Sequence, residues 1–496
     1  MKVFIASALM MLICVNAGAQ SQGVAYTAVG KGVATTFVTD YHTLGINTSA
    51  LGWKNEYGKR FTIGMTEFGF GMYSDSLDVT RLRKLYKAMR TQIAGNEEEP
   101  ADWDEQKQYA TDYLNKGVAI FANYNWGGFA FQNEKFGGIA VSVNENYQWY
   151  SKLSENTTDI LFNGKLAEYF DSLTIVFGND TSMIANGQYS DDTLNAVIMG
   201  SISTPLNLSA MTNGTEIRMA WNRFYNVGYG RKLFGKDSLF VLYGGIGGRY
   251  IQSMAMFDMV SDDDGLRMYS SVSPNFNIDY GSIANLNPST YSQQGRGLPK
   301  SVGSGYGIDL SLSAILFNRL KIAVAANNIG SVTYDRNVYR VKDTLVANLQ
   351  LAGLSEYNIT QAVNQFLQDG GILELEGVEK YTINNAANLR IGASFDFGKI
   401  AKIGVDFVAP FNRQNPGSFA NPVFSVGGEI RPVKWLAISA GYFGGGIYKN
   451  NMPVGINFSF KDGTYEFGIS SYDALTFFMN NSNSISAAFG VARVRF

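Results

Sequence analysis

The sequence predicts an all-β fold, a transmembrane antiparallel β-barrel of about fourteen strands. Three observations predict it. Apolar and polar residues alternate in strand-length segments, the links between those segments alternate between short and long, and the composition suits strands. The chain of 496 residues has 33 Phe, 28 Tyr and 54 Gly but only 10 Pro. Such a composition is typical of many strands with aromatic girdles and few breaks.

The alternation is clear in single segments. In Leu389–Phe397 the odd positions are Leu, Ile, Ala, Phe and Phe, and the even ones are Arg, Gly, Ser and Asp. Successive side chains of a strand point to opposite faces, so one face can meet lipid and the other a wet lumen. The predicted strands are 58–73, 117–132, 135–150, 213–232, 237–255, 303–316, 318–334, 381–397, 399–409, 421–431, 434–445, 451–461, 464–472 and 484–496.

Charged residues on the polar faces are predicted to point into the lumen. They are Arg218, Arg390, Asp396, Asp406, Arg493 and Arg495. Such a set can form an ion-selective constriction or can pair across the lumen. Pairing is favoured, because unpaired charge is costly where water is excluded.

The links between the strands alternate in length. Those after the even strands are tight, as at Asn133–Glu134 and Asp462–Gly463. The links after the first odd strands are long and span 74–116, 151–212, 256–302 and 335–380. Outer-membrane barrels keep short turns on the periplasmic side and long loops outside, whereas a soluble sandwich has no reason to separate its links in this way. With an even number of strands, both termini are predicted to be periplasmic.

Inside the long links the hydrophobic spacing changes to that of helices. The predicted helical stretches are 82–93, 103–114, 160–170 and 345–367. We expect them to pack on one another as a lid over the extracellular mouth, rather than each to make a specific contact.

The amino-terminal residues 1–19 predict a signal peptide. Lys2 precedes an apolar run, and Ala17 and Ala19 form a small-residue cleavage site. The only cysteine, Cys14, lies inside this segment. The mature chain is therefore expected to have no disulfide and no thiolate metal site.

The last strand, Ser484–Phe496, carries Phe496, Val494 and Ala492 on one face and two arginines on the other. A carboxyl-terminal Phe that closes such a strand resembles the ending of bacterial outer-membrane barrels. That resemblance implies that the strand pairs with the first one, near Phe61, and that the barrel assembly machinery recognises it. It also implies outer-membrane lipid around the wall.

Residues 20–57 precede the barrel of residues 58–496 and form a glycine-rich segment that could fold back into the lumen as a plug. Gly30-Lys-Gly-Val-Ala, Asp40-Tyr-His-Thr-Leu and Asn47-Thr-Ser-Ala-Leu-Gly resemble the hatch motifs of the FadL/TodX superfamily. Thr48-Ser49 stands where that family usually has Pro, so no fixed φ presets the turn. The closest resemblance is to uncharacterised Bacteroidota members with degenerate motifs, related to the type IX secretion shuttle barrel.

The resemblance implies a barrel in which a small hydrophobic compound is caught among the extracellular loops and leaves when the hatch moves. We expect the protein to have no cofactor. The residues that match the hatch by position are Asp40, Asn47, Ser49, Ala50, Leu51 and Gly52.

Other motifs favour structural roles. His42 and Ser49 could form a hydrolytic pair, but a third orienting group would be needed. The acid triplets Asp262–Asp264 and Glu97–Glu99 lack the spacing of a dedicated calcium loop and are expected to be solvated turns. With 40 basic and 42 acidic residues, no charge excess indicates a nucleic-acid partner.

Three functions follow from these features. The first is passive transport of a small hydrophobic compound through a hatch-gated lumen, which an apolar pocket between hatch and loops would favour. The second is a non-transport part or shuttle of a secretion or surface-assembly machinery, which a lumen packed with charged pairs and a partner protein would favour. The third, a lipid-modifying barrel enzyme, needs His42 within reach of a serine; we expect the protein not to be an enzyme.

Overall fold

The computed structural model describes residues 25–496 except 79, 81–102, 237–238, 279, 293–296, 354–372, 413–414, 419–420, 447 and 475–482. The predicted signal peptide, the predicted helix 82–93 and the triplet Glu97–Glu99 therefore lie outside the described residues. Among the residues described, no helix is both long and apolar enough to cross a membrane.

Within the described part of the chain, 14 strands close into one antiparallel barrel. They are β1 (Phe61–Ser74), β2 (Val118–Asn133), β3 (Gly137–Lys152), β7 (Glu216–Lys236), β8 (Phe240–Asp262), β10 (Gly303–Leu316), β11 (Leu320–Tyr334), β16 (Asn388–Asp396), β17 (Ala401–Pro410), β18 (Val423–Val433), β19 (Leu436–Gly445), β21 (Val454–Phe460), β22 (Tyr465–Ser471) and β23 (Ser484–Arg495). Each of the predicted strands matches one of them. The all-β barrel is confirmed.

The barrel is closed by the pairing of its last strand with its first. In the β1–β23 ladder Thr62 lies opposite Arg495 and Tyr73 lies opposite Ser484. The terminal residue extends this ladder, since the Phe61 amide donates to the Phe496 carbonyl at 2.9 Å and the Phe496 amide donates back at 3.0 Å. The two rings stack with their centroids 5.5 Å apart, as the sequence predicts for this seam.

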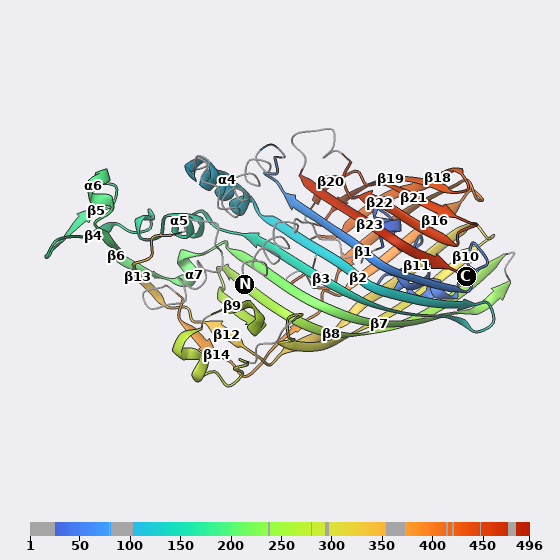
Figure 1. Ribbon diagram of the computed structural model, residues 1–496, viewed down its shortest axis with the longest axis horizontal. Helices are drawn as coiled ribbons and strands as arrows, with labels where there is room; N and C mark the ends of the chain where they lie inside the picture. The colour runs from blue at the N-terminus through green and yellow to red at the C-terminus, as the bar shows by residue number, and fades with distance from the viewer. Residues whose placement is uncertain are drawn as a thin grey trace.

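The short and long links lie at opposite ends of the barrel (Figure 1). The β10–β11 turn is tight because Phe317 and Asn318 take φ values of 53° and 56°, the left-handed geometry of tight hairpins. The carboxyl terminus lies at this short-turn end, and the loop elements project from the other end (Figure 1). The bounds of several links differ from the prediction; between β7 and β8 the link is shifted, since β7 continues to Lys236 and β8 begins only at Phe240.

The long loops contain helices and a second sheet. The helix α4 (Trp103–Lys116) lies where a helix is predicted. The helix α5 (Glu155–Asn163) begins and ends earlier than the predicted stretch 160–170. The Ser154 side chain accepts from the Thr157 amide and caps its start. The remaining described loop elements include the short helices η3 (Gly164–Leu166), α6 (Asp191–Leu194), α7 (Leu208–Met211), η4 (Pro274–Phe276) and η5 (Gly281–Asn285).

The second sheet has the strand order β13-β6-β4-β5. Its strands are β4 (Ser172–Phe177), β5 (Asp180–Ala185), β6 (Val197–Asn207) and β13 (Leu345–Leu349). The predicted helix 345–367 is therefore wrong at its start, because Leu345–Leu349 pairs with β6 instead. Beyond residue 353 that prediction falls on residues that are not described.

Five further short strands extend the barrel sheet toward the loops. They are β9 (Gly265–Val272), β12 (Val338–Val341), β14 (Leu375–Gly377), β15 (Tyr381–Asn384) and β20 (Tyr448–Asn451). A buried apolar cluster joins the second sheet to the extension of the barrel, since it contains Val346 of β13, Met268 of β9 and Tyr339 of β12. The loop end is therefore a folded structure with a core of its own.

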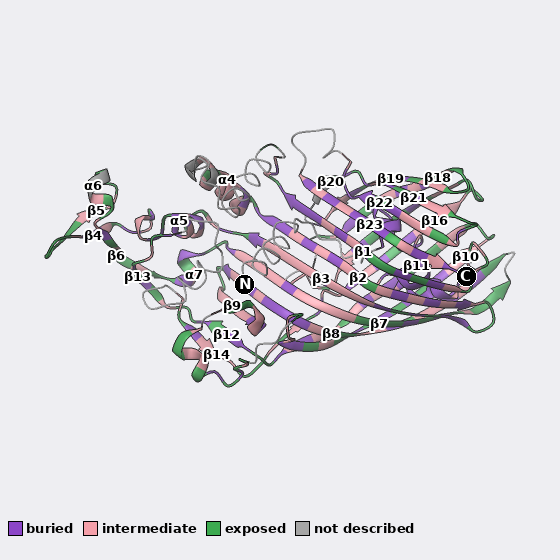
Figure 2. Ribbon diagram, in the orientation of Figure 1, coloured by how far each residue is buried: buried purple, intermediate pink, exposed green. Residues whose placement is uncertain are grey.

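The barrel wall is apolar outside and polar inside. On β10 the outward side chains of Tyr306, Leu310 and Leu312 are 60, 49 and 53% exposed, whereas Asp309 and Ser311 between them are buried. The same alternation of buried and exposed residues runs along the other barrel strands (Figure 2). An apolar outer face of this kind suits a lipid environment, as expected for an outer-membrane barrel.

Candidate functional site

Residues 25–57 lie inside the barrel and are called the lumen segment below. They contain only short helices, α2 (Tyr26–Val29), η1 (Asp40–Thr43) and η2 (Thr48–Gly52), and most of their residues are buried. Figure 1 draws them in blue between the barrel strands. The segment contacts β1, β2, β3, β7, β8, β10, β21, β22 and β23, so it reaches much of the inner circumference.

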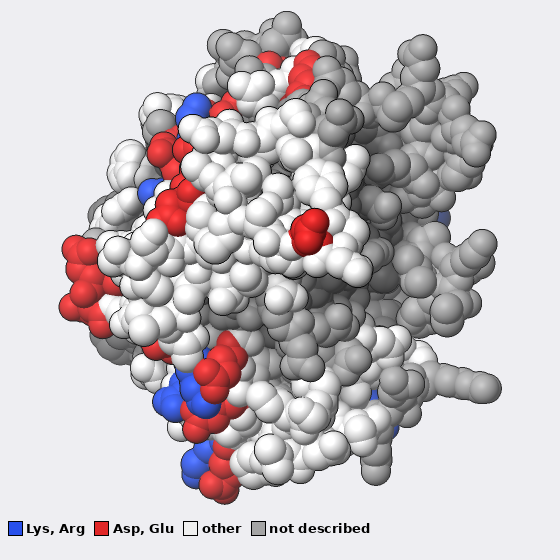
Figure 3. All heavy atoms as spheres, turned by 90° about the vertical axis from the view of Figure 1, so that its left-hand side faces the viewer, with Lys and Arg blue, Asp and Glu red and all other residues white. Residues whose placement is uncertain are grey.

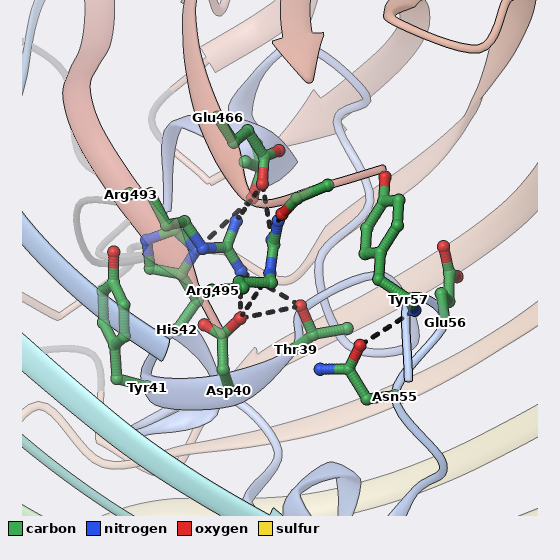
Figure 4. A network of polar contacts seen from close by, with 12 residues as sticks. Thr39, Asp40, Tyr41, His42, Asn55, Glu56, Tyr57, Glu466, Arg493 and Arg495 are labelled. Carbon is green, nitrogen blue, oxygen red and sulfur yellow. Dashed lines mark hydrogen bonds and ion pairs between the residues drawn. The ribbon is translucent and has the colours of Figure 1, made fainter. Parts of the chain in front are cut away.

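Asp40 binds the last strand of the barrel. Its Oδ2 lies 2.5 Å from Arg493 Nη2 and 3.6 Å from Arg495 Nε. Glu466 of β22 holds the same two arginines, at 3.1 Å from Arg493 and 2.5 Å from Arg495. Two carboxylates and two guanidinium groups therefore compensate one another in a buried cluster (Figure 4).

The backbone of Asp40 is also unusual, with a φ of 49°. Aspartate and asparagine tolerate this left-handed conformation better than most residues. The residue type at this position therefore serves the turn as well as the ion pair.

Tyr41 and His42 bind Glu67 of β1. The Tyr41 hydroxyl donates to Glu67 Oε1 at 2.5 Å, and His42 Nε2 lies 2.9 Å from the same oxygen. Asn125 donates to Glu67 Oε2 at 2.7 Å. Burial, and next the Glu67 carboxylate, raise the pKa of Tyr41 well above its ordinary value, so the hydroxyl stays a donor.

The wall makes room for Tyr41 by lacking side chains opposite it. A Cβ at Gly64 of β1 would lie 1.7 Å from the Tyr41 hydroxyl, and one at Gly128 of β2 would lie 2.3 Å from its ring. Neither position can carry a larger residue unless the tyrosine moves. The glycine content of the strands thus partly reflects the fit of the lumen segment.

Two acids on the neighbouring strands β17 and β18 hold the first part of the lumen segment. Asp406 Oδ2 accepts from the amides of Ala34 and Thr35 at 2.7 and 2.9 Å. Glu429 forms a buried ion pair with Lys31 at 2.9 Å. The Asp406 interaction is a carboxylate that caps free backbone donors, which is stronger than a neutral hydrogen bond.

Asn47 and Ser49 hold the next part of the lumen segment in place. Asn47 donates to the carbonyl of Thr35 at 2.8 Å and so ties two turns of the segment together. The Ser49 hydroxyl donates to Asn47 Oδ1 and accepts from the Ser313 hydroxyl of β10, both at 2.6 Å, and the Ser49 amide donates to Ser311 at 2.7 Å. The turn that lacks the proline of the resembling family is therefore held by hydroxyl contacts to the wall.

Ala50, Leu51 and Gly52 fill the space beside this contact. Ala50 and Leu51 are each 1% exposed, and Gln132 of β2 donates to the Leu51 carbonyl at 3.1 Å. A Cβ on Gly52 would lie 2.8 Å from the backbone of Arg231 on β7. The structure thus brings all six hatch-matching residues against the wall.

The predicted lumen charges divide into two groups. Asp406, Arg493 and Arg495 touch the lumen segment, and the fully buried Arg390 interacts electrostatically with Asp406. Arg218 instead pairs with Glu216 of its own strand at 2.9 Å.

Asp396 also pairs within the wall. It lies 3.0 Å from Lys321 of β11. Lys321 in turn lies 5.1 Å from the centre of the Trp53 ring, so this pair borders the lumen segment through its cation.

Beside the lumen segment the barrel holds a cavity with about 1140 Å³ of empty space, which includes a part open to solvent. Tyr41, His42, Leu44, Gly45 and Ile46 of the lumen segment line one side of it. Ten asparagines and one glutamine line it as well, mostly from β2, β3, β7 and the residues just before β16. The described cavity is therefore lined by a mixture of amide groups and apolar side chains such as Leu44, Phe224 and Ile251, with few charged groups.

The sequence prediction missed several of these residues. Glu67 binds the lumen segment, and Glu466 binds Arg493 and Arg495 of the last strand. A single acid in a strand does not show which face is inward. The asparagines did leave a signal: Asn123 and Asn125, and then Asn144 and Asn146, occupy alternate positions of consecutive strands. Alternation of one residue type marks a shared face.

The hydrolytic pair is not formed. His42 contacts Glu67 and lies 3.4 Å from the Thr27 hydroxyl, while Ser49 is bonded to Asn47 and Ser313. In the described part of the chain, no group of three or more His, Cys, Asp or Glu is placed to hold a metal. Asp262–Asp264 lies at the β8–β9 turn.

A family described as being of unknown function, DUF5723, matches residues 152–470, which is more than half of the chain. The chain belongs to the DUF5723 family. The match begins at the end of β3 and ends in β22, so most of the wall and its loops belong to the family's common region. No curated protein matches the sequence.

Solved structures similar to this DUF5723 member include hydrocarbon transporters and a FadL homologue. The TodX toluene transporter of Pseudomonas putida is 9% identical with a TM-score of 0.40, over 95% of this chain and 96% of that one. The TbuX toluene transporter of Ralstonia pickettii is 10% identical with a TM-score of 0.42, over 96% and 99%. A FadL homologue of Pseudomonas aeruginosa is 9% identical with a TM-score of 0.38, over 95% and 97%.

These proteins are from the superfamily that the hatch motifs resemble. At these scores no property of theirs is carried over to this chain. The narrower placement beside Bacteroidota members stays a prediction.

Proposed function

We propose that this DUF5723 member is a gated channel of the outer membrane, in which the lumen segment is the gate. The observation that carries the proposal is the way residues 25–57 are held. They occupy the lumen without joining any ladder of the described barrel sheet, and they are fastened to the wall by hydrogen bonds, ion pairs and three small buried clusters of apolar side chains. The hydrogen bonds can be exchanged for contacts with water, whereas release of a barrel strand would break a continuous ladder.

The position of the cavity supports this proposal. The cavity is lined by the lumen segment on one side and partly open to solvent, and the segment is drawn toward the short-turn end of the barrel (Figure 1). A compound in the cavity would touch Tyr41 and His42, both of which bind Glu67 of the wall. Occupation of the cavity can therefore bear directly on one of the gate's attachments.

The resemblance implies a small hydrophobic cargo, and two of the similar structures are described as toluene transporters. For this chain that cargo remains a proposal. The amide groups that line the cavity make it necessary to test polar compounds beside hydrophobic ones.

The test compares uptake by cells that carry the protein with uptake by cells that lack it. Radiolabelled toluene, a medium-chain fatty acid and neutral saccharides serve as probes. We expect at least one of these compounds to enter faster with the protein present. Equal uptake of every probe by both kinds of cell, with folded protein verified in the outer membrane, would contradict the channel.

A second candidate function, a part of a secretion or surface-assembly machinery, is favoured by the sheet that projects from the loop end (Figure 1). On this sheet Phe177, Met183 and Leu345 are 51, 65 and 66% exposed, and β5 is an edge strand that can accept a further strand. We expect a partner protein to copurify in mild detergent and to be lost when residues 172–185 are deleted. Recovery of the monomer alone would count against this function.

A further inference from the structure

We propose that the cavity beside the lumen segment is a binding site for an uncharged, hydroxyl-rich molecule, a saccharide. The inference rests on the proposed channel function and names the class of compound that the channel takes. Its starting point is a row of asparagines across three neighbouring strands. In the ladders Asn123 of β2 lies opposite Asn146 of β3, and Asn146 lies opposite Asn222 of β7.

The second observation is that buried amide atoms along this face have no protein partner. Asn123 and Asn125 are 3 and 1% exposed. Asn123 Nδ2, Asn125 Oδ1 and Asn222 Oδ1 make no hydrogen bond within the described structure. Buried polar atoms are rarely left without a partner, so these point to a ligand or to water in the cavity.

The presence of amide atoms without a hydrogen-bond partner does not depend on which way each amide group is rotated. Asn125 donates to the Glu67 carboxylate, which can only accept, so its Oδ1 must be the free atom. Asn123 uses one amide atom for Asn146. If its amide were rotated, the other atom would be left free. The site therefore offers both acceptors and donors.

The charged groups around the cavity are already compensated. Arg249, which lines the cavity, is bound by both carboxylate oxygens of Asp309, at 2.6 and 2.8 Å. Glu67 is bound by Tyr41, His42 and Asn125. The described surface at the loop end is mostly uncharged, with acidic and basic side chains in small groups (Figure 3).

An uncharged hydroxyl group matches this lining because it both donates and accepts, as an amide does. An apolar compound would leave the free amide atoms without partners, and a compound with net charge would find no free counter-charge among the lining groups described. The half-buried Phe224 also lines the cavity and adds aromatic surface to the amide lining.

The experiment measures binding to the purified full-length protein in detergent by ligand-observed NMR. The probes are neutral trisaccharides of different linkage, namely maltotriose, cellotriose, laminaritriose and chitotriose, together with toluene. We expect at least one trisaccharide to bind. Asn222→Leu should weaken that binding at least about fivefold, as expected for the loss of a polar partner in a site built for hydroxyl groups.

Asn222→Leu is suited to this test because Asn222 Oδ1 makes no hydrogen bond within the described structure, so the substitution breaks none at that atom. The control is Asn163→Leu on the exposed surface of α5, which should not change binding. A double variant, Asn123→Leu with Asn146→Leu, removes both partners of one amide–amide bond and should abolish binding. Heat-modifiable migration on gels shows that each variant is folded.

Absence of binding by every trisaccharide, or toluene binding that Asn222→Leu strengthens, would overturn the inference. The proposed channel function and the proposed binding site are contradicted by different results. Saccharide binding without protein-dependent uptake would overturn the channel and leave the site. Protein-dependent uptake that Asn222→Leu does not affect would leave the channel and overturn the site.

Discussion

At the scale of single residues, the lumen segment is held by buried charges that balance one another. Asp40 and Arg493 have side chains that are 0 and 2% exposed. Ions that have lost their water depend on their partners, so removal of one partner leaves a charge that is costly to bury. By contrast, Lys54 and Glu134 form a pair whose side chains are 76 and 68% exposed, and such pairs contribute little.

We expect Asp40→Asn to lower the free energy of unfolding by roughly 3 kcal/mol, because Arg493 and Arg495 would share the single carboxylate of Glu466. Asparagine keeps the shape of the side chain and tolerates the positive φ of this position. The measurement is urea unfolding of the purified barrel in detergent.

The matched control for Asp40→Asn is Glu134→Ala, which breaks the exposed pair and should change the free energy of unfolding by less than about 1 kcal/mol. Equal effects of the two substitutions would show that the Asp40 cluster does not stabilise the fold.

At the scale of elements, the last strand closes the wall and also holds the gate. The inward face of β23 changes parity at an irregularity in its pairing with β22, between the Glu466–Arg493 and Gly468–Gly490 pairs. Arg493 and Arg495 therefore point to the lumen segment, whereas Phe489 and Val491 face outward and are 37 and 51% exposed. The strand therefore couples closure of the barrel to placement of residues 25–57.

Phe496→Ala should reduce the fraction of protein that reaches the folded state in the outer membrane, if the terminal ring is recognised during assembly. The ring itself is 56% exposed, so the molecules that do assemble should unfold at nearly the same urea concentration as the wild type. The assay is the ratio of heat-modifiable to unfolded protein in membrane fractions.

Phe489→Ala is the control for the terminal ring, because Phe489 lies on the same strand and its ring packs on that of Phe68 at 5.6 Å. It should leave the assembled fraction unchanged. A similar loss in both variants would assign the effect of Phe496 to general packing.

The strands could be predicted from the sequence because each one carries its own alternation of apolar and polar residues. The second sheet could not, since Leu345, Val346 and Leu349 also fit helical spacing. The pairing with β6, more than a hundred residues away, decides their conformation. A local pattern cannot contain such a partner.

The residues of the candidate site likewise include some that local motifs predict and some that they do not. The hatch motifs and the arginines of the last strand are local signals, and the structure brings Asp40 and Arg493 together. Glu67 has no marker in the sequence, because its role depends on which lumen residues reach it. The amide cavity is assembled from several strands, so no single segment predicts it.

At the scale of the whole molecule, a folded loop end lies above an amide-lined cavity, and the cavity lies against a gate that is fastened around the wall. The barrel strands themselves are joined by continuous ladders, whereas residues 25–57 contribute no strand to the described barrel sheet and contain only short helices. If the channel opens, the lumen segment is therefore the part expected to move.

The most direct measurement is uptake through a barrel whose gate is locked to the wall. The Ser49 and Ser313 hydroxyl oxygens lie 2.6 Å apart, close to the roughly 2 Å of a disulfide, and the chain has one other cysteine, Cys14. In the variant Ser49→Cys with Ser313→Cys, we expect oxidation to stop protein-dependent uptake and a reductant to restore it, while Ser49→Cys alone transports in both states. Undiminished uptake through fully cross-linked protein would contradict the gate.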